Sequence, residues 1–134
     1  MNDKNTGVYQ LKYRKLWLSV AWILITSIIV LSLIPSLPDS GFNHGDKIGH
    51  ITAYALATWW LVQLYPSSRY LLITLALVSL GILLEVAQGF SPYRHFDVYD
   101  ALANTTGVAA GWLVNKTVLG ATVQKLEKRI LSKT

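Results

Sequence analysis

Long apolar blocks separated by short polar breaks run through most of the chain. Three of these blocks have few interruptions, and each is long enough as a helix to cross a hydrocarbon core of about 30 Å. A fourth is richer in Ala, Gly and Thr, which are frequent where membrane helices pack closely. The pattern predicts one all-α membrane domain over residues 1–134, an integral four-helix bundle with transmembrane helices over about residues 16–35, 47–65, 70–90 and 97–119.

After the fourth block, apolar residues recur at helical spacing with basic residues between them. The apolar positions are Leu119, Val123, Leu126 and Ile130, and the basic ones are Lys125, Lys128 and Arg129. This spacing predicts a short basic amphipathic helix on the inner leaflet, where basic side chains meet anionic lipid. A plain solvated helix or a frayed tail is the alternative interpretation.

Composition and charge give the class and the orientation. The chain is 52% hydrophobic and only 14% charged, which is not expected of a soluble domain. Its 12 Lys and Arg residues outnumber its 7 Asp and Glu residues, and most lie in the two terminal flanks. Cytoplasmic flanks carry such an excess, and an even number of crossings leaves both ends on one side, so both termini are expected in the cytoplasm. Because the positive charge is split over two membrane flanks, it indicates membrane lipids as partners and no nucleic acid.

The first apolar block is expected to be a retained helix and not a cleaved signal peptide. It is too long for the apolar region of a signal peptide, and no small-x-small cleavage site follows it. Pro35 and Pro38 are expected to end the helix where it leaves the membrane. The chain has no cysteine, so disulfides and thiol chemistry are excluded.

Polar residues gather where the second helix is expected to begin. Asp46, His50 and Tyr54 are spaced by four and so share one helix face, with Lys47 beside them. A structural role is the alternative for the first two positions, with Asp46 favoured by the helix dipole and Lys47 as a headgroup anchor. His50 lies one turn into the bilayer and needs a partner there.

Glu85 follows a long uncharged run near the end of the third helix, with Gln88 on the same face. A lone carboxylate at this depth costs several kcal/mol unless it is neutralised or paired. Arg94, Lys47 and His50 are the partners expected at the same depth. A purely structural interhelical salt bridge is the alternative to a functional role.

The fourth helix carries a stripe of polar and small residues at steps of three and four. Its members are Asp97, Asp100, Asn104, Gly107 and Gly111. The glycines would allow close approach of a neighbouring helix, and the polar half is expected to face the bundle interior, not lipid.

The order and spacing of these positions resemble the VanZ-like family of small bacterial membrane proteins. The resemblance covers residues 46–111 and rests on Asp46, Lys47, His50, Tyr54, Glu85, Gln88, Arg94, Asp97, Asp100, Asn104, Gly107 and Gly111. It implies a multi-pass protein of the bacterial cytoplasmic (inner) membrane, in a family whose namesake is linked to teicoplanin resistance, a glycopeptide antibiotic resistance. No biochemical activity follows from the resemblance, and no resistance role is assigned to this chain.

The chemistry of the site must come from its charges. The carboxylates outnumber the basic residues when His50 is neutral, so the site needs a cation, protons or water. A divalent cation would satisfy it, with ligands from Asp97, Asp100, Glu85 and His50. Such a cation could hold a phosphate-bearing envelope lipid or lipid-linked molecule, with Arg94 and Lys47 as direct phosphate donors.

Three classes of function therefore remain open. The first is a site that binds a phosphate-bearing envelope lipid; chemical modification of that lipid is the smaller part of this class. The second is a structural or partner-binding membrane protein whose polar residues only lock the helices together. The third is a proton- or ion-coupled transporter, which at this size would need a homodimer for alternating access.

Overall fold

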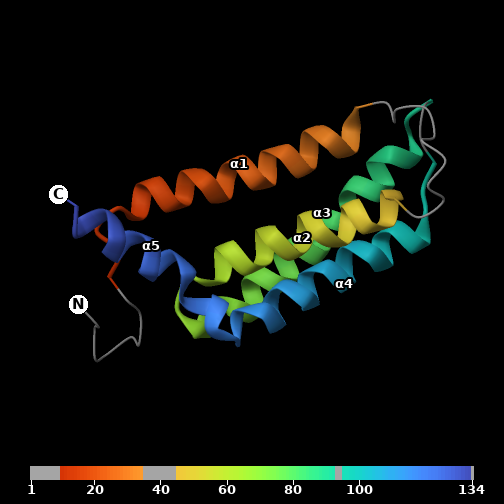
Figure 1. Cartoon of the computed structure of the whole chain (residues 1–134). Helices are drawn as coiled ribbons and strands as arrows, with labels where there is room; N and C mark the ends of the chain where they lie inside the picture. Colours follow the sequence, from red (N-terminus) through yellow and green to blue (C-terminus); the bar gives the residue numbers. More distant parts are fainter. Residues whose placement is uncertain (1–9, 35–44, 93–94, 134) are drawn as a thin grey trace.

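The computed structural model describes residues 10–34, 45–92 and 95–133. Within these ranges the chain forms helices and no strand, which confirms the all-α prediction. The main helices are α1 (Arg14–Leu33), α2 (Gly45–Val62), α3 (Tyr70–Gly89), α4 (Val98–Asn115) and α5 (Thr122–Leu131) (Figure 1). Short 3-10 turns, η1 (Ser67–Arg69) and η2 (Val118–Ala121), precede α3 and α5.

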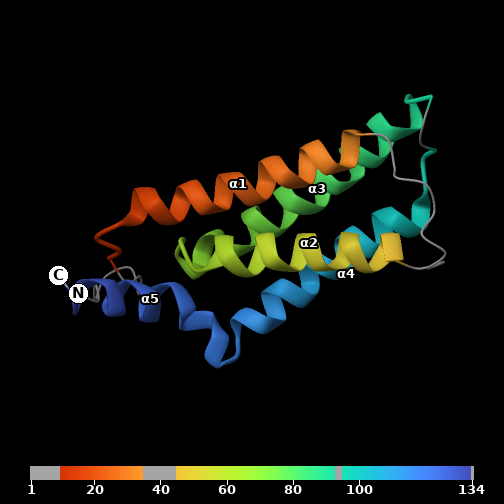
Figure 2. The same cartoon turned by 45° about the horizontal axis from the view of Figure 1, so that its top comes forward.

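Helices α1 to α4 run lengthwise beside one another, and α5 lies at the end where α1 begins (Figures 1 and 2). A core between the four long helices is built from side chains of each of them: Ile28, Tyr54, Ala57, Leu77, Leu84 and Val108. α1 ends at Leu33, and Pro35 and Pro38, expected to end this helix, lie outside the described residues.

The most extensive contact between helices joins α2 and α4, and two glycines explain it. A Cβ on Gly107 would collide with the backbone oxygen of Ile51, and one on Gly111 with that of Ala55. Hydrogen in place of a side chain therefore lets the α4 backbone lie against the α2 backbone. This close contact fixes the start of α2 beside the start of α4.

The outer surface of the bundle is apolar. α1 and the segment Ser67–Gly89 are long and apolar enough to cross a membrane, and most of each faces outward. Large side chains such as Trp22 and Leu71 are 65% and 70% exposed, which a water-soluble bundle would avoid over such an area. Small and polar residues lower the hydropathy of α2 and α4, so neither of these helices is counted as apolar enough to be a candidate span. The described helices thus give two candidate spans and the surface of a membrane protein.

The C-terminal segment forms α5, so the frayed-tail alternative is wrong. Of the apolar positions expected to line one face, Val123 is buried, whereas Leu119, Leu126 and Ile130 are exposed. Val123 packs with Trp17 and other residues at the start of α1 and the end of α2. α5 is therefore docked on the bundle through one edge and exposes much of its remaining surface.

Candidate functional site

The expected polar residues meet at one end of the bundle, opposite α5. The starts of α2 and α4 and the end of α3 lie together there (Figure 1). We refer to the interacting residues from α2 and from the start of α4 as the polar cluster: Asp46, Lys47, His50, Asp97, Asp100 and Asn104. Because α2 is held against α4 by the glycine contact, these side chains face one another across a narrow interface.

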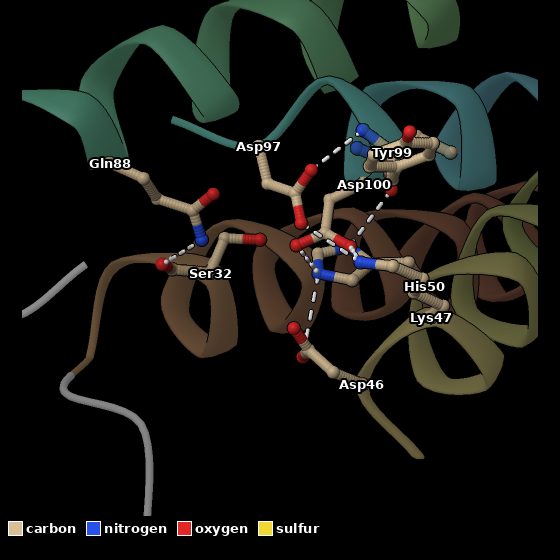
Figure 3. Close-up of polar contacts among 9 residues, drawn as sticks. Ser32, Asp46, Lys47, His50, Gln88, Asp97, Tyr99 and Asp100 are labelled. Atoms are coloured by element: carbon tan, nitrogen blue, oxygen red, sulfur yellow. Dashed lines mark hydrogen bonds and ion pairs between the residues drawn. The ribbon is translucent and has the colours of Figure 1, made fainter. Parts of the chain in front are cut away.

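Lys47 bridges two carboxylates at the start of α4. Its Nζ donates to Asp97 Oδ2 at 2.9 Å and to Asp100 Oδ1 at 2.6 Å (Figure 3). Asp97 also caps α4, because its Oδ1 accepts a hydrogen bond from the backbone N–H of Tyr99 at 2.8 Å. The hydrogen bond from Lys47, assisted by the one from Tyr99, holds the pKa of the Asp97 carboxyl below its usual value.

His50 lies at the inner edge of the polar cluster and is nearly buried. Its Nδ1 is 2.9 Å from Oδ1 of Asn104, so Nδ1 carries the hydrogen when that amide oxygen accepts. Its Nε2 then points toward two carboxylates, 3.7 Å from Asp46 Oδ1 and 3.8 Å from Asp100 Oδ2 (Figure 3). A neutral imidazole oriented by a hydrogen bond on one nitrogen is the usual arrangement of a metal-binding histidine.

Asp46, His50 and Asp100 could together hold a metal ion. One ligand atom from each lies within 4.8 Å of the others, and the Asp46 side chain is 64% exposed. Nitrogen and carboxylate oxygen ligands of this kind suit zinc or another divalent transition metal. Of the ligands expected from the sequence, His50 and Asp100 belong to this group, while Asp97 faces Lys47.

Glu85 is buried beneath the polar cluster. It is 1% exposed, and the backbone N–H of Asp97 is within hydrogen-bonding reach of its carboxylate. Tyr54 is equally buried, and its hydroxyl lies beside Gly81 of α3 together with the Asn104 amide. Within the described part of the chain, neither Glu85 Oε2 nor the Tyr54 hydroxyl has a hydrogen-bond partner. Two buried unpaired oxygens are costly, and they favour a bound proton, water or ligand at this position.

Of the remaining expected residues, those that the structure describes have partners outside the polar cluster. Gln88 is buried, but its Nε2 donates to the backbone oxygen of Ser32 at 2.7 Å and ties α3 to the end of α1 beside the polar cluster (Figure 3). Gly107 and Gly111 lie in the α2–α4 contact. Arg94 lies outside the described residues.

Sequence reasoning missed one buried polar anchor at the other end of the bundle. Glu127 of α5 is fully buried, and its Oε1 accepts hydrogen bonds from the Tyr13 backbone N–H at 2.7 Å and from Trp17 Nε1 at 3.3 Å. The signal was present, because Glu127 follows Val123 by four residues and therefore shares its buried face.

Comparison with known proteins gives a family. No match to the chain is found among curated proteins or among solved structures. The VanZ/LLP1 family model matches residues 3–119, a stretch that contains α1 to α4 and the whole polar cluster. The chain therefore belongs to the VanZ/LLP1 family, as the resemblance in its polar residues predicted.

Proposed function

We propose that this VanZ/LLP1 protein crosses the bacterial inner membrane four times, with α1 to α4 as the spans. Both termini are cytoplasmic, and the polar cluster faces outward. The apolar exterior of α1 and α3 supports this topology, as do the basic residues in both terminal flanks. The lower hydropathy of α2 and α4 agrees with their placement, since they bury their polar residues against each other.

A single cysteine tests the orientation. His95 is exposed, lies in the loop between α3 and α4, and the chain has no native cysteine. In intact cells, a His95→Cys variant should react with a membrane-impermeant thiol reagent. Labelling only after lysis would place the polar cluster on the cytoplasmic side.

We propose further that the polar cluster binds the phosphate group of an envelope lipid or lipid-linked molecule through a divalent cation. The observation that carries this proposal is the convergence of His50 Nε2 with the carboxylates of Asp46 and Asp100. Lys47 is shared by two carboxylates, so among the described residues neither Asp46 nor the buried Glu85 forms an ion pair with a lysine or an arginine. A cation relieves this excess of negative charge and offers open positions to phosphate oxygens.

Basic side chains beside the cation would complete phosphate recognition. Lys47 already lies at the exposed edge of the polar cluster, with its side chain 32% exposed. It can exchange its hydrogen bond to Asp97 for one to a phosphate oxygen without leaving Asp100. Arg94 precedes Asp97 by three positions in the sequence and is proposed as the second phosphate donor.

Manganese binding provides the direct test, because Mn²⁺ is a paramagnetic probe that accepts nitrogen and oxygen ligands. Detergent-solubilised wild type should bind one Mn²⁺, as measured by electron paramagnetic resonance, and loss of the proposed ligand in His50→Gln should weaken binding at least about tenfold. His95→Gln removes the same chemistry from an exposed loop and should bind like wild type. Equal binding by all three proteins would sink the cation proposal.

The lipid part of the proposal needs its own measurement. Wild type in nanodiscs should retain phosphatidic acid more strongly with Mn²⁺ than with a chelator, and Asp100→Asn should abolish that difference. Phosphatidylcholine, whose phosphate is shielded by choline, serves as the reference lipid. If retention of phosphatidic acid is the same with Mn²⁺ as with a chelator and is unchanged in Asp100→Asn, the cation site has no role in lipid binding.

A structural role is the second candidate function, favoured by the bridge from Lys47 to Asp97 and Asp100. This bridge joins α2 to α4 whether or not a ligand binds. If the polar cluster only locks the helices together, Asp97→Asn should have a lower melting temperature than wild type. In that case wild type itself should bind neither Mn²⁺ nor the lipid. A variant that folds normally but loses the ligand supports the binding function instead.

A further inference from the structure

A groove about 360 Å³ in volume opens between α1 and α3 at the end of the bundle opposite the polar cluster. Its size falls within the range of roughly 300–1,000 Å³ that is usual for small-molecule sites. In both views α1 lies along one side of the other long helices (Figures 1 and 2). The walls of the groove are apolar side chains: Leu18, Trp22, Ile25, Leu72, Ala76 and Leu80.

One end of this groove is strongly basic. Tyr65 and Arg69 line it, and the Arg69 guanidinium carbon lies 5.9 Å from the centroid of the Tyr65 ring. The guanidinium carbon of Arg14, at the start of α1, lies 5.4 Å from the same centroid. One aromatic ring therefore holds two positive charges at the mouth of the groove. Among the described residues, neither guanidinium forms an ion pair, so both remain available to an anion.

We propose that this groove binds one anionic phospholipid, with an acyl chain between α1 and α3 and the phosphate at Arg14 and Arg69. An open apolar groove along the outside of a membrane helix suits an acyl chain, and guanidinium groups are strong phosphate donors. Tyr65 suits the boundary between the two, since tyrosine favours the membrane interface.

The positive charges of Arg14 and Arg69 at the mouth of the groove favour an anionic lipid over other molecules that could occupy it. A second copy of this chain would bring its own basic flank toward Arg14 and Arg69, and repulsion between like charges disfavours that pairing. A zwitterionic lipid would bring a positive group with its phosphate. An anionic headgroup carries the complementary charge alone, and basic residues at this depth attract it. This lipid site needs no metal and shares no residue with the polar cluster.

Native mass spectrometry tests the headgroup part of the proposal, using detergent-solubilised protein mixed with equal amounts of phosphatidylglycerol and phosphatidylcholine. Wild type should retain one phosphatidylglycerol, in preference to phosphatidylcholine by on the order of tenfold. Arg14→Gln/Arg69→Gln should reduce that preference to about onefold. Lys116→Gln/Lys125→Gln removes the same charge from the same end of the bundle and should keep the wild-type preference. No preference in wild type, or equal loss in both double variants, overturns the proposal.

The acyl-chain part is tested by filling the groove. Ala76 is an exposed small residue on its wall, so Ala76→Trp should block the chain and lower retention of phosphatidylglycerol at least about fivefold. Ala109→Trp places the same side chain on an exposed position of α4 outside the groove and should bind lipid like wild type. Unchanged retention in Ala76→Trp overturns the groove as the binding site. Because a chelator should not alter this retention, the result is independent of the cation proposal.

Discussion

Lys47 Nζ lies 2.9 Å from Asp97 Oδ2, so the first turn of α2 is bonded to the residue that caps α4. The same ammonium group also contacts Asp100. One side chain therefore bridges two carboxylates and joins two helices whose sequence separation is large.

Replacing this lysine should destabilise the fold. Lys47→Met keeps most of the length of the side chain but removes the ammonium donor from Asp97 and from the nearly buried Asp100, at a cost of about 1–3 kcal/mol. Thermal unfolding in detergent, followed by circular dichroism, measures the change. Lys125→Met, which loses an exposed lysine on α5, should unfold close to wild type. A Lys47→Met melting temperature equal to that of the control would show that the bridge contributes nothing to stability.

Acid should weaken the protein through Asp97. The folded-state pKa of this carboxyl lies below its usual value of 3.8, mainly because Lys47 donates to it. Its ionised form therefore stabilises the fold above the unfolded-state pKa, and that contribution is lost as the pH falls through the folded-state pKa. Melting temperatures should be measured from roughly pH 6 to pH 2. Below the usual pKa of an aspartate, they should fall more steeply with decreasing pH in wild type than in Lys47→Met. Parallel curves would contradict this assignment.

A single methyl group should separate α2 from α4. In Gly111→Ala the new Cβ meets the backbone oxygen of Ala55, which cannot move aside without shifting the helix, and we expect a loss of about 1–3 kcal/mol. Gly49→Ala is the matched control, because a Cβ at that position of α2 meets nothing within 4 Å. The control should gain up to about 1 kcal/mol from the higher helix propensity of alanine. Equal melting temperatures for the two variants would argue against close packing at Gly111.

The buried acid of α5 should hold that helix to α1. Glu127→Ala removes the acceptor for Tyr13 and Trp17, at a cost of about 1–3 kcal/mol, and should speed hydrogen exchange along α5. Glu127→Gln retains an oxygen that can accept both hydrogen bonds and should exchange more slowly than Glu127→Ala. Fast exchange in the wild type itself would mean that α5 is not docked in solution.

The helices and the faces of the polar residues could be predicted from the sequence. Spacing by three and four places Asp97, Asp100 and Asn104 on one face of α4, and the same rule aligns Asp46 with His50 on α2. The end of α4 was less predictable. Its apolar pattern continues to Leu119, but the helix ends at Asn115, and the Thr117 side chain accepts a hydrogen bond from the Leu119 N–H in the turn that follows.

The choice of partners across helices could not be predicted in the same way. Gln88 lies beside the polar cluster, but its partner is the backbone oxygen of Ser32, an acceptor that every residue type offers. Asp46 was predicted to share a helix face with His50 but not to be a metal ligand, because its approach to Asp100 depends on how α4 lies against α2. Such pairings are set by the packing of whole helices and leave no local pattern in the sequence.

The bond between Glu127 and the start of α1 has a consequence for biosynthesis. Tyr13 and Trp17 are translated before Glu127, which follows them by 114 and 110 positions. α1 is therefore synthesised before the residue that holds its first turn in place. This end of the bundle can therefore close only after α5 has been translated.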